Sequence, residues 1–490
     1  MTEAGAAIIP GMKILFVASE MAPFAKVGGL ADVAGALPEA LARRGHEVRV
    51  VMPAYDVVAD NGFRPHRVDP EMLGLDVGSH RVVADVLGLD HGSVSVTFID
   101  VPSLYHRGQL YSEASDEPAR FAVLSRAALE LCRRWRWEPD VIHCNDWQTG
   151  LIPLYLKTIY ADEPLFSSTR TVLTIHNLAY QGVFEAPVVE QLGLDAATHL
   201  LPTEHLKQGR VSFLATGIVH ADTITTVSPT YAREIVTPEH GHGLDGLLRR
   251  RAGDLVGILN GIDTEVWNPA LDRHLPFRYS AKSLWRKEWN KKELLESLGL
   301  DHREGVPVFG LVSRLVEQKG IGLIPQPMSG ILEQTDARFV ALGSGDANLE
   351  ATLWSLVDRF PEQARFVSAF DEPLSHRIEA GVDVFLMPSR YEPSGLNQMY
   401  SLAYGTPPLV RKTGGLADTV EHWDPTDGTG TGFVFEDYDE GGLWWALSQA
   451  LTALRDRRGW KRLQLNGMAI DNSWNHSAGR YEKLYRRLVA

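Results

Sequence analysis

The stretch that decides the fold is residues 13–52, which read KILFVASEMAPFAKVGGLADVAGALPEALARRGHEVRVVM. Lys13–Ala18 is a short apolar run typical of a buried strand. Leu30–Arg44 has the apolar spacing of a helix, and Gly45 is placed to end it. Glu47–Met52 is a second strand-like run. A strand, a helix and a strand in this order predict one βαβ unit.

The same alternation continues along the chain. In the first half, further strands are predicted to end at His143, His176, Val227 and Leu259. After a polar region rich in Trp and Lys, strands are predicted at Val306–Ser313, Arg338–Leu342, Arg365–Ala369, Val382–Met387 and Pro408–Val410. Parallel strands joined by crossover helices follow from such a pattern, so the predicted fold class is α/β with two Rossmann-like domains.

The pause in this alternation predicts a domain boundary near Gly261. We expect residues 1–11 to be a disordered leader, because they lack the basic start and long apolar centre of a secretory signal. Residues 12–261 and 262–470 are expected to form the two domains. Residues 471–490 are expected to close the fold as a C-terminal helix, since apolar and aromatic residues recur there at helical spacing.

Composition excludes several classes of function. No apolar run is long enough to span a bilayer, so membrane insertion is not expected. The net charge of −14 disfavours a long-range attraction to nucleic acid. Cys132 and Cys144 are the only cysteines, too few for a disulfide framework, which favours a reducing compartment and a cytoplasmic location.

One segment occurs twice, as KVGGLAD at residues 26–32 and as KTGGLAD at residues 412–418. Both copies follow a predicted strand, where helix N-termini offer N–H groups to anions. In the first copy, Lys26 adds a positive charge beside Gly28 and Gly29, which lack side chains that would keep a phosphate from the backbone. The alternative interpretation is that the paired glycines serve backbone geometry alone.

Two further turns follow buried strands in the second half. SRLVEQKG at residues 313–320 places Arg314 and Lys319 five residues apart, a pair suited to neutralising a diphosphate as it leaves. PSRYEPSGL at residues 388–396 offers Glu392 to sugar hydroxyls and the N–H groups of Ser394, Gly395 and Leu396 to phosphate or sugar oxygens. A solvated basic turn and a helix-starting turn are the respective alternatives.

In the first half, HCNDW at 143–147 and HN at 176–177 close two predicted strands. Together, Asp146, His176 and Asn177 predict a sugar-binding site at this edge of the sheet. Taken alone, either His143 or His176 is better explained by a structural role at the end of its strand. No metal site is predicted. Asp437 and Asp439 match the Asp-x-Asp motif of metal-binding sites, but they lie in an acidic run typical of a solvated loop. No His/Cys cluster has zinc spacing.

The motifs KVGGLAD, HNLAYQG at 176–182, SRLVEQKG, YEPSGL at 391–396 and KTGGLAD occur together in an order that covers nearly the whole chain. As a set they resemble bacterial glycogen synthase and plant starch synthase. The resemblance implies the glycosyltransferase-B fold with a deep interdomain cleft, retention of anomeric configuration and no metal or other cofactor. It also implies ADP-glucose as donor, bound by the C-terminal domain, and an α-glucan as acceptor, bound by the N-terminal domain.

Carried over residue by residue, the resemblance assigns the donor diphosphate to Lys26, Arg314 and Lys319, with Asp32 close to Lys26. It assigns the sugar to His176, Asn177 and Glu392, and it places Asp146 near the reacting centre. Phe370, which precedes DEPLSH at 371–376, is matched to an aromatic residue beside the nucleotide base. Gly414 and Gly415 are expected to shape a loop that faces the donor, whereas Lys412 is expected to be solvated.

The sequence also departs from the family pattern. Ser394 replaces the usual Cys and Asn397 the usual Thr, and both substitutions keep a small or polar group. Pro325 and Pro327 fall where a helix normally follows the Lys-Gly turn, so we expect that helix to begin late or to be kinked.

The function implied is transfer of glucose from ADP-glucose to the non-reducing 4-hydroxyl of an α-1,4-glucan such as glycogen. Two alternatives stay open on the same fold. One is an ADP-glucose-dependent maltose-1-phosphate synthase, which differs only in its acceptor. The other is a non-catalytic glucan-binding relative, which the retained charged residues disfavour. Preference between ADP- and UDP-glucose is not set by these motifs.

Overall fold

The computed structural model describes residues 11–78 and 80–490, and these form two compact units. Unit 1 comprises the described residues up to Val227 together with Ala232–Ile258 and Trp474–Ala490. Unit 2 comprises Ser228–Tyr231 and Leu259–Ser473. The predicted leader lies outside the described residues except for Gly11, and the predicted bounds of the two domains stay predictions.

Unit 1 is built on a ten-stranded sheet in the order β12-β11-β8-β7-β1-β2-β6-β5-β3, with β4 paired to β5. From β12 to β6 all neighbours are parallel, whereas β5, β3 and β4 add an antiparallel extension. The strands are β1 (Lys13–Val17), β2 (Glu47–Pro53), β3 (His66–Arg67), β4 (Leu73–Val77), β5 (His80–His91), β6 (Val94–Asp100), β7 (Val141–Asn145), β8 (Arg170–Ile175), β11 (Thr223–Thr226) and β12 (Leu255–Gly257); β9 (Val183–Glu185) and β10 (Arg210–Ser212) form a separate pair.

The helices that follow these strands are mostly short. They are α1 (Gly29–Arg43), α2 (Asp56–Asp60), α3 (Pro102–Tyr105), α4 (Glu117–Arg134), α5 (Ile152–Lys157), α6 (Val188–Gln191), α7 (Thr203–Lys207), α8 (Phe213–His220), α10 (Asp245–Arg250) and α19 (Trp474–Val489), with 3₁₀ turns η1 (Trp147–Thr149), η2 (Pro164–Phe166), η3 (Asp195–Leu200) and η4 (Ala252–Asp254). Helix α9 (Pro229–Glu234) is divided, because its residues up to Tyr231 belong to unit 2. The last helix, α19, packs against α1, and its Tyr485 hydroxyl lies 2.7 Å from Nδ1 of the buried His143. His143 is therefore part of the core.

Unit 2 is a six-stranded, fully parallel sheet in the order β15-β14-β13-β16-β17-β18. Its strands are β13 (Val308–Val312), β14 (Arg338–Leu342), β15 (Ala364–Val367), β16 (Val384–Met387), β17 (Pro408–Arg411) and β18 (Phe433–Phe435). Its helices are α11 (Lys287–Ser297), α12 (Pro325–Gln334), α13 (Ala347–Arg359), α14 (Glu372–Gly381), α15 (Asn397–Ala403), α16 (Gly414–Thr419), α17 (Glu440–Leu454) and α18 (Arg457–Met468), with 3₁₀ turns η5 (Ala281–Arg286), η6 (Glu317–Lys319) and η7 (Ile321–Leu323).

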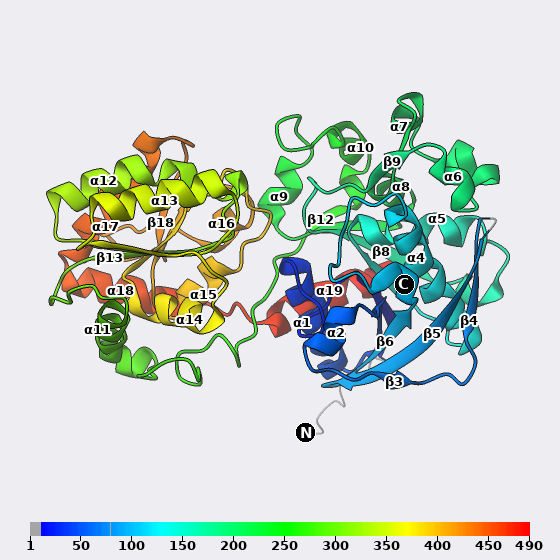
Figure 1. The fold of residues 1–490 in the computed structure, drawn as a ribbon, viewed down its shortest axis with the longest axis horizontal. Helices are drawn as coiled ribbons and strands as arrows, with labels where there is room; N and C mark the ends of the chain where they lie inside the picture. The colour runs from blue at the N-terminus through cyan, green and yellow to red at the C-terminus, as the bar shows by residue number, and fades with distance from the viewer. Residues whose placement is uncertain (1–10, 79) are drawn as a thin grey trace, which may run out of the picture. The chain divides into compact units, whose positions relative to one another are not determined.

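Side chains of each central strand of unit 2 alternate between two apolar cores. Phe309 and Leu311 of β13 pack with residues of α12, α13 and α17, whereas Val308 packs with residues of α11 and α14. Figure 1 shows α12 and α13 above the sheet and α11 and α14 below it. The strand is apolar throughout because both of its faces are covered, as in parallel sheets generally.

The sequence predicted most of these elements. The βαβ unit of residues 13–52 is confirmed as β1, α1 and β2, and the predicted strands of the second half are confirmed as β13 to β17 within a few residues. The predicted late start is also confirmed: α12 begins at Pro325, after the two 3₁₀ turns η6 and η7. Pro325 and Pro327 occupy its first turn, where no intrahelical N–H bond is lost.

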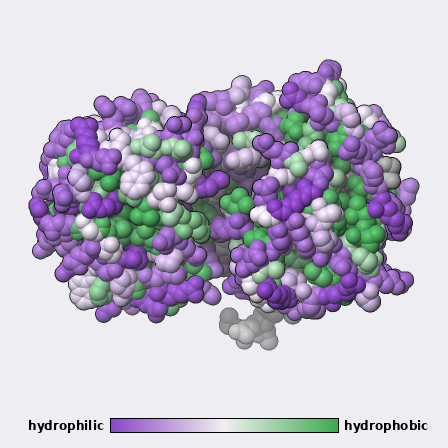
Figure 2. Space-filling view, viewed as in Figure 1, coloured by the Kyte–Doolittle hydropathy of each residue, from purple (hydrophilic) through white to green (hydrophobic). Residues whose placement is uncertain are grey.

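The described surface shows no sign of a membrane span. None of the helices in residues 11–78 and 80–490 combines the length and the apolar character that crossing a bilayer requires. On the face drawn in Figure 2, hydrophilic residues cover most of each unit and the apolar areas between them are small.

Candidate active site

In unit 1 the predicted residues lie just beyond the carboxyl ends of adjacent strands. Strands β7 and β8 are parallel neighbours with Asn145 opposite Thr174. The turns after them carry Asp146 and His176, and Oδ1 of Asp146 accepts a 2.7 Å hydrogen bond from the backbone N–H of His176. The structure thus brings together two residues that lie 30 positions apart in the sequence.

Asp146 has an unusual backbone conformation. Its φ of 54° and ψ of −168° lie outside the regions that residues with a side chain normally occupy. Such a conformation costs about 1–3 kcal/mol and is concentrated at functional sites. Here it turns the chain sharply at the end of β7, so that the carboxylate faces the N–H groups at the end of β8.

Burial sets the protonation of both groups. The pKa of Asp146 is raised to about 7, chiefly by burial. The hydrogen bond from the N–H of His176 opposes this rise, and the nearby charge of Glu20 adds to it. Burial also lowers the pKa of His176 to about 3, so the imidazole is neutral at pH 7. Its Nε2 lies 3.0 Å from Oδ1 of Asn145, whose Nδ2 donates to the carbonyl of Val17. With the amide assigned this way, Nε2 carries the proton.

Asn177 serves its own turn in the structure. Its Oδ1 accepts a 3.1 Å hydrogen bond from the N–H of Ala179. The predicted sugar-binding role of Asn177 stays a prediction.

The first glycine turn is occupied partly by a protein carboxylate. Oε2 of the buried Glu20 accepts hydrogen bonds from the N–H groups of Val27 and Gly28, at 2.5 and 3.2 Å. On the Cβ side, an added methyl at Gly29 would meet no atom within 4 Å, and one at Gly28 only Oε1 of Glu20 at 3.8 Å. The two glycines therefore leave space in which a phosphate could come close to the backbone, but the N–H of Gly28 already donates to Glu20.

Lys26 and Asp32 form an ion pair across this turn, with Nζ and Oδ1 at 2.6 Å. Lys26 is about half exposed, and such an exposed pair is worth little to stability. Its ammonium can therefore leave Asp32 for a phosphate at small cost.

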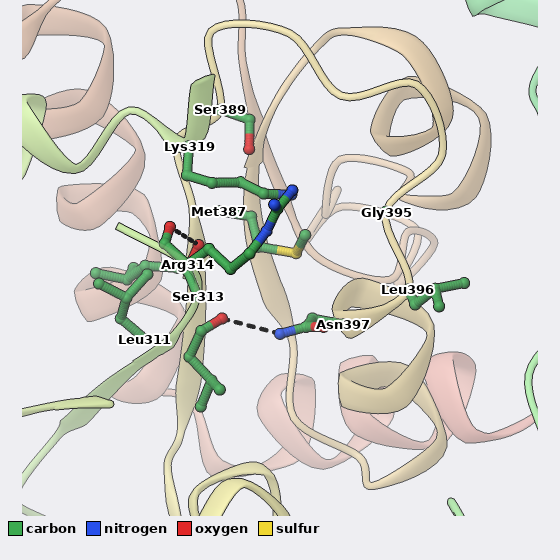
Figure 3. Close-up of a pocket in the computed structure, with 11 residues that line it drawn as sticks. Leu311, Ser313, Arg314, Lys319, Met387, Ser389, Gly395, Leu396 and Asn397 are labelled. Carbon is green, nitrogen blue, oxygen red and sulfur yellow. Dashed lines mark hydrogen bonds between the residues drawn. The ribbon is translucent and has the colours of Figure 1, made fainter. Parts of the chain in front are cut away.

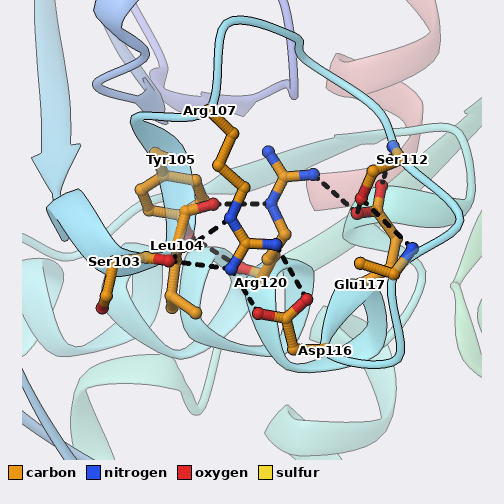
Figure 4. A network of polar contacts seen from close by, with 9 residues as sticks. Ser103, Leu104, Tyr105, Arg107, Ser112, Asp116, Glu117 and Arg120 are labelled. Carbon is orange, nitrogen blue, oxygen red and sulfur yellow. Dashed lines mark hydrogen bonds and ion pairs between the residues drawn. The ribbon is translucent and has the colours of Figure 1, made fainter.

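A polar network holds the loop between α3 and α4 (Figure 4). Arg120 is fully buried on α4, pairs with Glu117 at 2.6 Å and donates to the carbonyl of Leu104 at 2.8 Å. Arg107 pairs with Asp116, which fastens the other end of the same loop. This loop carries Tyr111, whose hydroxyl contacts Ser19 at 2.9 Å and hydrogen-bonds Glu20.

Burial raises the pKa of Glu20, while the N–H bonds from Val27 and Gly28 lower it. Glu20 was not predicted as a site residue. The only signal in the sequence was its position three residues after β1, in a turn that corresponds to those of Asp146 and His176 after β7 and β8.

In unit 2, a pocket of about 180 Å³ lies at the carboxyl ends of β13 and β16. Its lining includes Arg314, Lys319, Ser389, Gly395 and Leu396. Figure 3 shows the charged ends of Arg314 and Lys319 directed toward the same part of this pocket. Among the described residues, no carboxylate pairs with Arg314, which is exposed. The pocket therefore presents an unneutralised guanidinium.

Lys319 is held differently. Its Nζ lies 2.6 Å from Oε2 of the buried Glu392, and the hydroxyl of Ser389 donates to the same oxygen at 3.1 Å. The sequence predicted both charged residues as ligands of the donor, yet it did not predict that they pair with each other. A contact between residues 73 positions apart leaves no signal in local spacing.

The turn after Glu392 is packed against the second glycine pair. An added Cβ would lie 1.9 Å from the carbonyl oxygen of Glu392 at Gly414, and 2.0 Å from that of Ser394 at Gly415. The N–H of Gly415 donates to the carbonyl of Glu392 at 3.0 Å. The Glu392–Ser394 turn thus packs directly on Gly414 and Gly415. A side chain at either position would overlap this turn, so the fold itself requires glycine there.

Of the remaining predicted residues, Phe370, Lys412 and Ser394 lie outside the pocket lining, whereas Asn397 belongs to it. Phe370 is 89% exposed, just before α14. Lys412 pairs with Glu436 at 2.6 Å with both side chains exposed, as expected of a solvated lysine. Ser394 is buried, and its hydroxyl donates to the carbonyl of Gly395 at 3.3 Å. Asn397 donates to the carbonyl of Val312 at 2.9 Å, which joins the start of α15 to the end of β13.

One group of side chains in the described chain could hold a metal ion: His274, Glu372 and His376. None of them lines the pocket with Arg314 and Lys319.

Two family models match the chain. The starch synthase catalytic domain matches residues 13–250, and the glycosyl transferases group 1 family matches residues 296–462. A glycogen synthase from an Anaeromyxobacter species is 49% identical over 98% of this chain and 100% of that protein. Glycogen synthase 2 from Geobacter sulfurreducens is 46% identical over 97% of this chain and 98% of that protein.

Two solved structures are similar as well. The catalytic domain of starch synthase IV from Arabidopsis thaliana, bound to ADP and acarbose, superposes with a TM-score of 0.88 at 38% identity, covering 98% of this chain and 99% of that one. Sucrose-phosphate synthase from Thermosynechococcus elongatus superposes with a TM-score of 0.58 at 18% identity, over 97% and 98% of the two chains, and shares the fold.

Proposed function

This chain belongs to the family of bacterial glycogen synthases and plant starch synthases, and from that premise we propose that it transfers glucose from ADP-glucose to the non-reducing 4-hydroxyl of an α-1,4-glucan. Its fold is the glycosyltransferase-B fold of that family, and it is a retaining glycosyltransferase. The identity of donor and acceptor is the proposal.

The observation that carries the proposal is the unit 2 pocket. Arg314 brings a charge that no described carboxylate neutralises to the carboxyl ends of β13 and β16, where ligands of parallel sheets bind. When the bond between glucose and the diphosphate breaks, negative charge develops on the leaving phosphate. A guanidinium and an ammonium directed at one place stabilise that charge more than they stabilise the bound donor, which lowers the barrier.

Lys319 and Glu392 divide two tasks in this proposal. Without donor, each neutralises the other at 2.6 Å. With donor, the ammonium turns to the phosphate, and the carboxylate accepts hydrogen bonds from glucose hydroxyls. The pair therefore holds Lys319 extended in the pocket before the donor arrives, which reduces the ordering that binding requires.

The residues of unit 1 fit the reacting sugar. The glucosyl group becomes positively charged as ADP leaves, and the neutral imidazole of His176 does not repel it as an imidazolium would. Asp146 adds a carboxyl group in the turn after the neighbouring strand, and Lys26 adds a third cation for the diphosphate. Phe370 is 89% exposed, so its ring is accessible for stacking of the adenine.

A cytoplasmic location is part of the proposal. Cys132 and Cys144 are both buried and free, and burial raises the pKa of each thiol, so neither is a reactive thiolate. A protein that does not use its thiols for crosslinking suits a reducing compartment.

The test follows nucleotide release from ADP-glucose and UDP-glucose, with glycogen and glucose 1-phosphate as competing acceptors. We expect ADP release that depends on glycogen. Release that depends on glucose 1-phosphate instead would show a maltose-1-phosphate synthase, and no release with either acceptor would show a non-catalytic relative.

The same assay tests the residues. Arg314→Ala should lower kcat/KM roughly 100-fold or more, the usual effect of removing one group that stabilises transition-state charge. Arg303→Ala is the matched control, because Arg303 is an exposed cation of unit 2 that pairs with Asp301 away from the pocket. An Arg314→Ala enzyme within threefold of the parent contradicts the assignment.

A further inference from the structure

Three side chains that commonly ligate metals meet at the amino end of α14. Glu372 and His376 stand four residues apart on this helix, which places them on one face. His274 comes from a turn about a hundred residues earlier in the chain. One potential ligand atom of each lies within 4.8 Å of the other two.

A buried carboxylate orients the ring of His376 and fixes the backbone of the turn that carries His274. Oδ2 of Asp272, which is 3% exposed, lies 2.8 Å from Nδ1 of His376, and Oδ1 of Asp272 accepts the backbone N–H of His274 at 2.8 Å. The hydroxyl of Tyr404 donates to Oδ2 as well. A carboxylate on one ring nitrogen is the usual support of a metal-bound histidine, because it fixes the tautomer and leaves the lone pair on the other nitrogen.

That other nitrogen has no partner. Nε2 of His376 is fully buried, and no hydrogen-bond partner reaches it within the described part of the chain. The ring cannot turn away to find one, since Trp267 stacks on it at 3.8 Å with the planes 8° apart. An unsatisfied buried polar atom costs about 1–3 kcal/mol, so a ligand at this position would remove a standing cost.

We propose that His274, Glu372 and His376 bind one Zn²⁺ ion, with water completing the coordination. Two imidazoles and one carboxylate are a donor set that zinc takes readily. The ion would tie the start of α14 to the 272–274 turn. It has no part in glucosyl transfer, because none of its ligands lines the Arg314 pocket.

One neighbouring cation modulates this site. Nε of Arg273 lies 3.2 Å from Nε2 of His274, so the guanidinium donates to the ring nitrogen that would face a metal. Arg273 is exposed and can turn into solvent. Its positive charge nevertheless opposes a divalent cation, and Arg273→Ala should bind zinc more tightly than the parent.

The test uses the full chain after treatment with a chelator and its removal. Zinc titration by calorimetry should show one site with a Kd below about 10 μM, and Co²⁺ in its place should give the visible absorption of a tetrahedral ion. His274→Ala and Glu372→Gln should each weaken binding roughly tenfold or more. Both positions are only partly buried or exposed, so these variants are expected to fold.

The matched control is His302→Ala. Nε2 of His302 lies 3.0 Å from Oε1 of Glu288, a His–Glu pair of unit 2 outside the cluster, and this variant should bind zinc as the parent does. Zinc should also raise the Tm of the parent and of His302→Ala but not that of His274→Ala, because binding to the folded state alone stabilises it. Equal zinc affinity in the parent, His274→Ala and Glu372→Gln overturns the proposal, as does absence of binding by the parent at 100-fold the expected Kd, about 1 mM zinc.

Discussion

The two copies of Lys-x-Gly-Gly-Leu-Ala-Asp share six of seven residues by type and position, yet the fold uses them differently. Around Gly28 and Gly29 in unit 1 the Cβ side is open. Around Gly414 and Gly415 in unit 2 the backbone of the Glu392–Ser394 turn occupies that side at about 2 Å. In the first copy the missing side chains leave room for a ligand. In the second they leave room for the protein itself.

The charged ends differ too. Lys26 pairs with Asp32 inside its own segment, so the pair can open without disturbing the fold. In the second copy, Lys412 pairs with Glu436 on the surface, and Asp418 accepts two hydrogen bonds from Thr230, at 2.6 and 2.8 Å. A repeated motif therefore identifies a repeated strand-turn-helix geometry, while the neighbours of each copy decide its use.

The largest expected difference concerns the glycines. Gly415→Ala should destabilise unit 2 by about 4 kcal/mol or more, because the new methyl would overlap a backbone oxygen at 2.0 Å in a buried turn. Gly29→Ala, the matched change in the first copy, should alter stability by no more than about 1 kcal/mol. Urea unfolding of both variants measures this, and similar midpoints would contradict the distinction.

The predicted acidic residues of the two units, Asp146 in unit 1 and Glu392 in unit 2, also differ. Burial raises the pKa of Asp146 to about 7, whereas Glu392 is paired with Lys319. Below about pH 4 Asp146 is protonated in both the folded and the unfolded chain. As the pH rises toward 7, the unfolded chain ionises first and the folded state loses stability; above pH 7 the loss is complete. At 1.4 kcal/mol per pKa unit, the loss is at most about 4 kcal/mol.

Asp146→Asn removes this titration. Its stability relative to the parent should therefore rise between pH 4 and pH 7 and stay constant above, while its activity falls at every pH. Unfolding midpoints of both proteins over this range are the measurement. A constant difference across the range would show that Asp146 does not titrate as described.

A smaller effect separates the two aspartates of the motif. Asp418→Ala should destabilise the protein by about 1–3 kcal/mol, since it leaves the N–H and hydroxyl of Thr230 without this acceptor. Asp32→Ala removes a partly exposed ion pair and should cost less than about 1 kcal/mol. The order of the two thermal midpoints checks this, and a reversed order would count against it.

Much of the fold was predictable because parallel strands covered on both faces are continuous apolar runs. Val308–Val312 and Val384–Met387 are such runs, and their ends were placed within two residues. The antiparallel extension was not predicted. Strand β5 (His80–His91) buries alternate residues, Ala84, Val86 and Gly88, but its partly exposed face also carries Leu87 and Leu89, so its sequence has no clear period of two.

The site was predictable where a residue lies in the turn that follows a strand. This position predicted Asp146 and His176, which directly follow β7 and β8, and Arg314 and Lys319, which lie two and seven residues after β13. Contacts between distant segments were not: Glu20 on the Val27–Gly28 turn and the Lys319–Glu392 pair are products of the fold. The cluster of His274, Glu372 and His376 was not predicted for the same reason. The fold brings His274 to two residues that lie about a hundred positions later, and no short spacing of ligands in the sequence marks such a site.

The different roles of the two motif copies are tested most directly by comparing their lysines. Lys26→Ala should lower kcat/KM for ADP-glucose roughly tenfold or more, since it removes a cation from the donor diphosphate. Lys412→Ala should stay within about twofold of the parent, since it removes only a solvated ion pair. Equal losses in the two variants would contradict the claim that the copies have different roles.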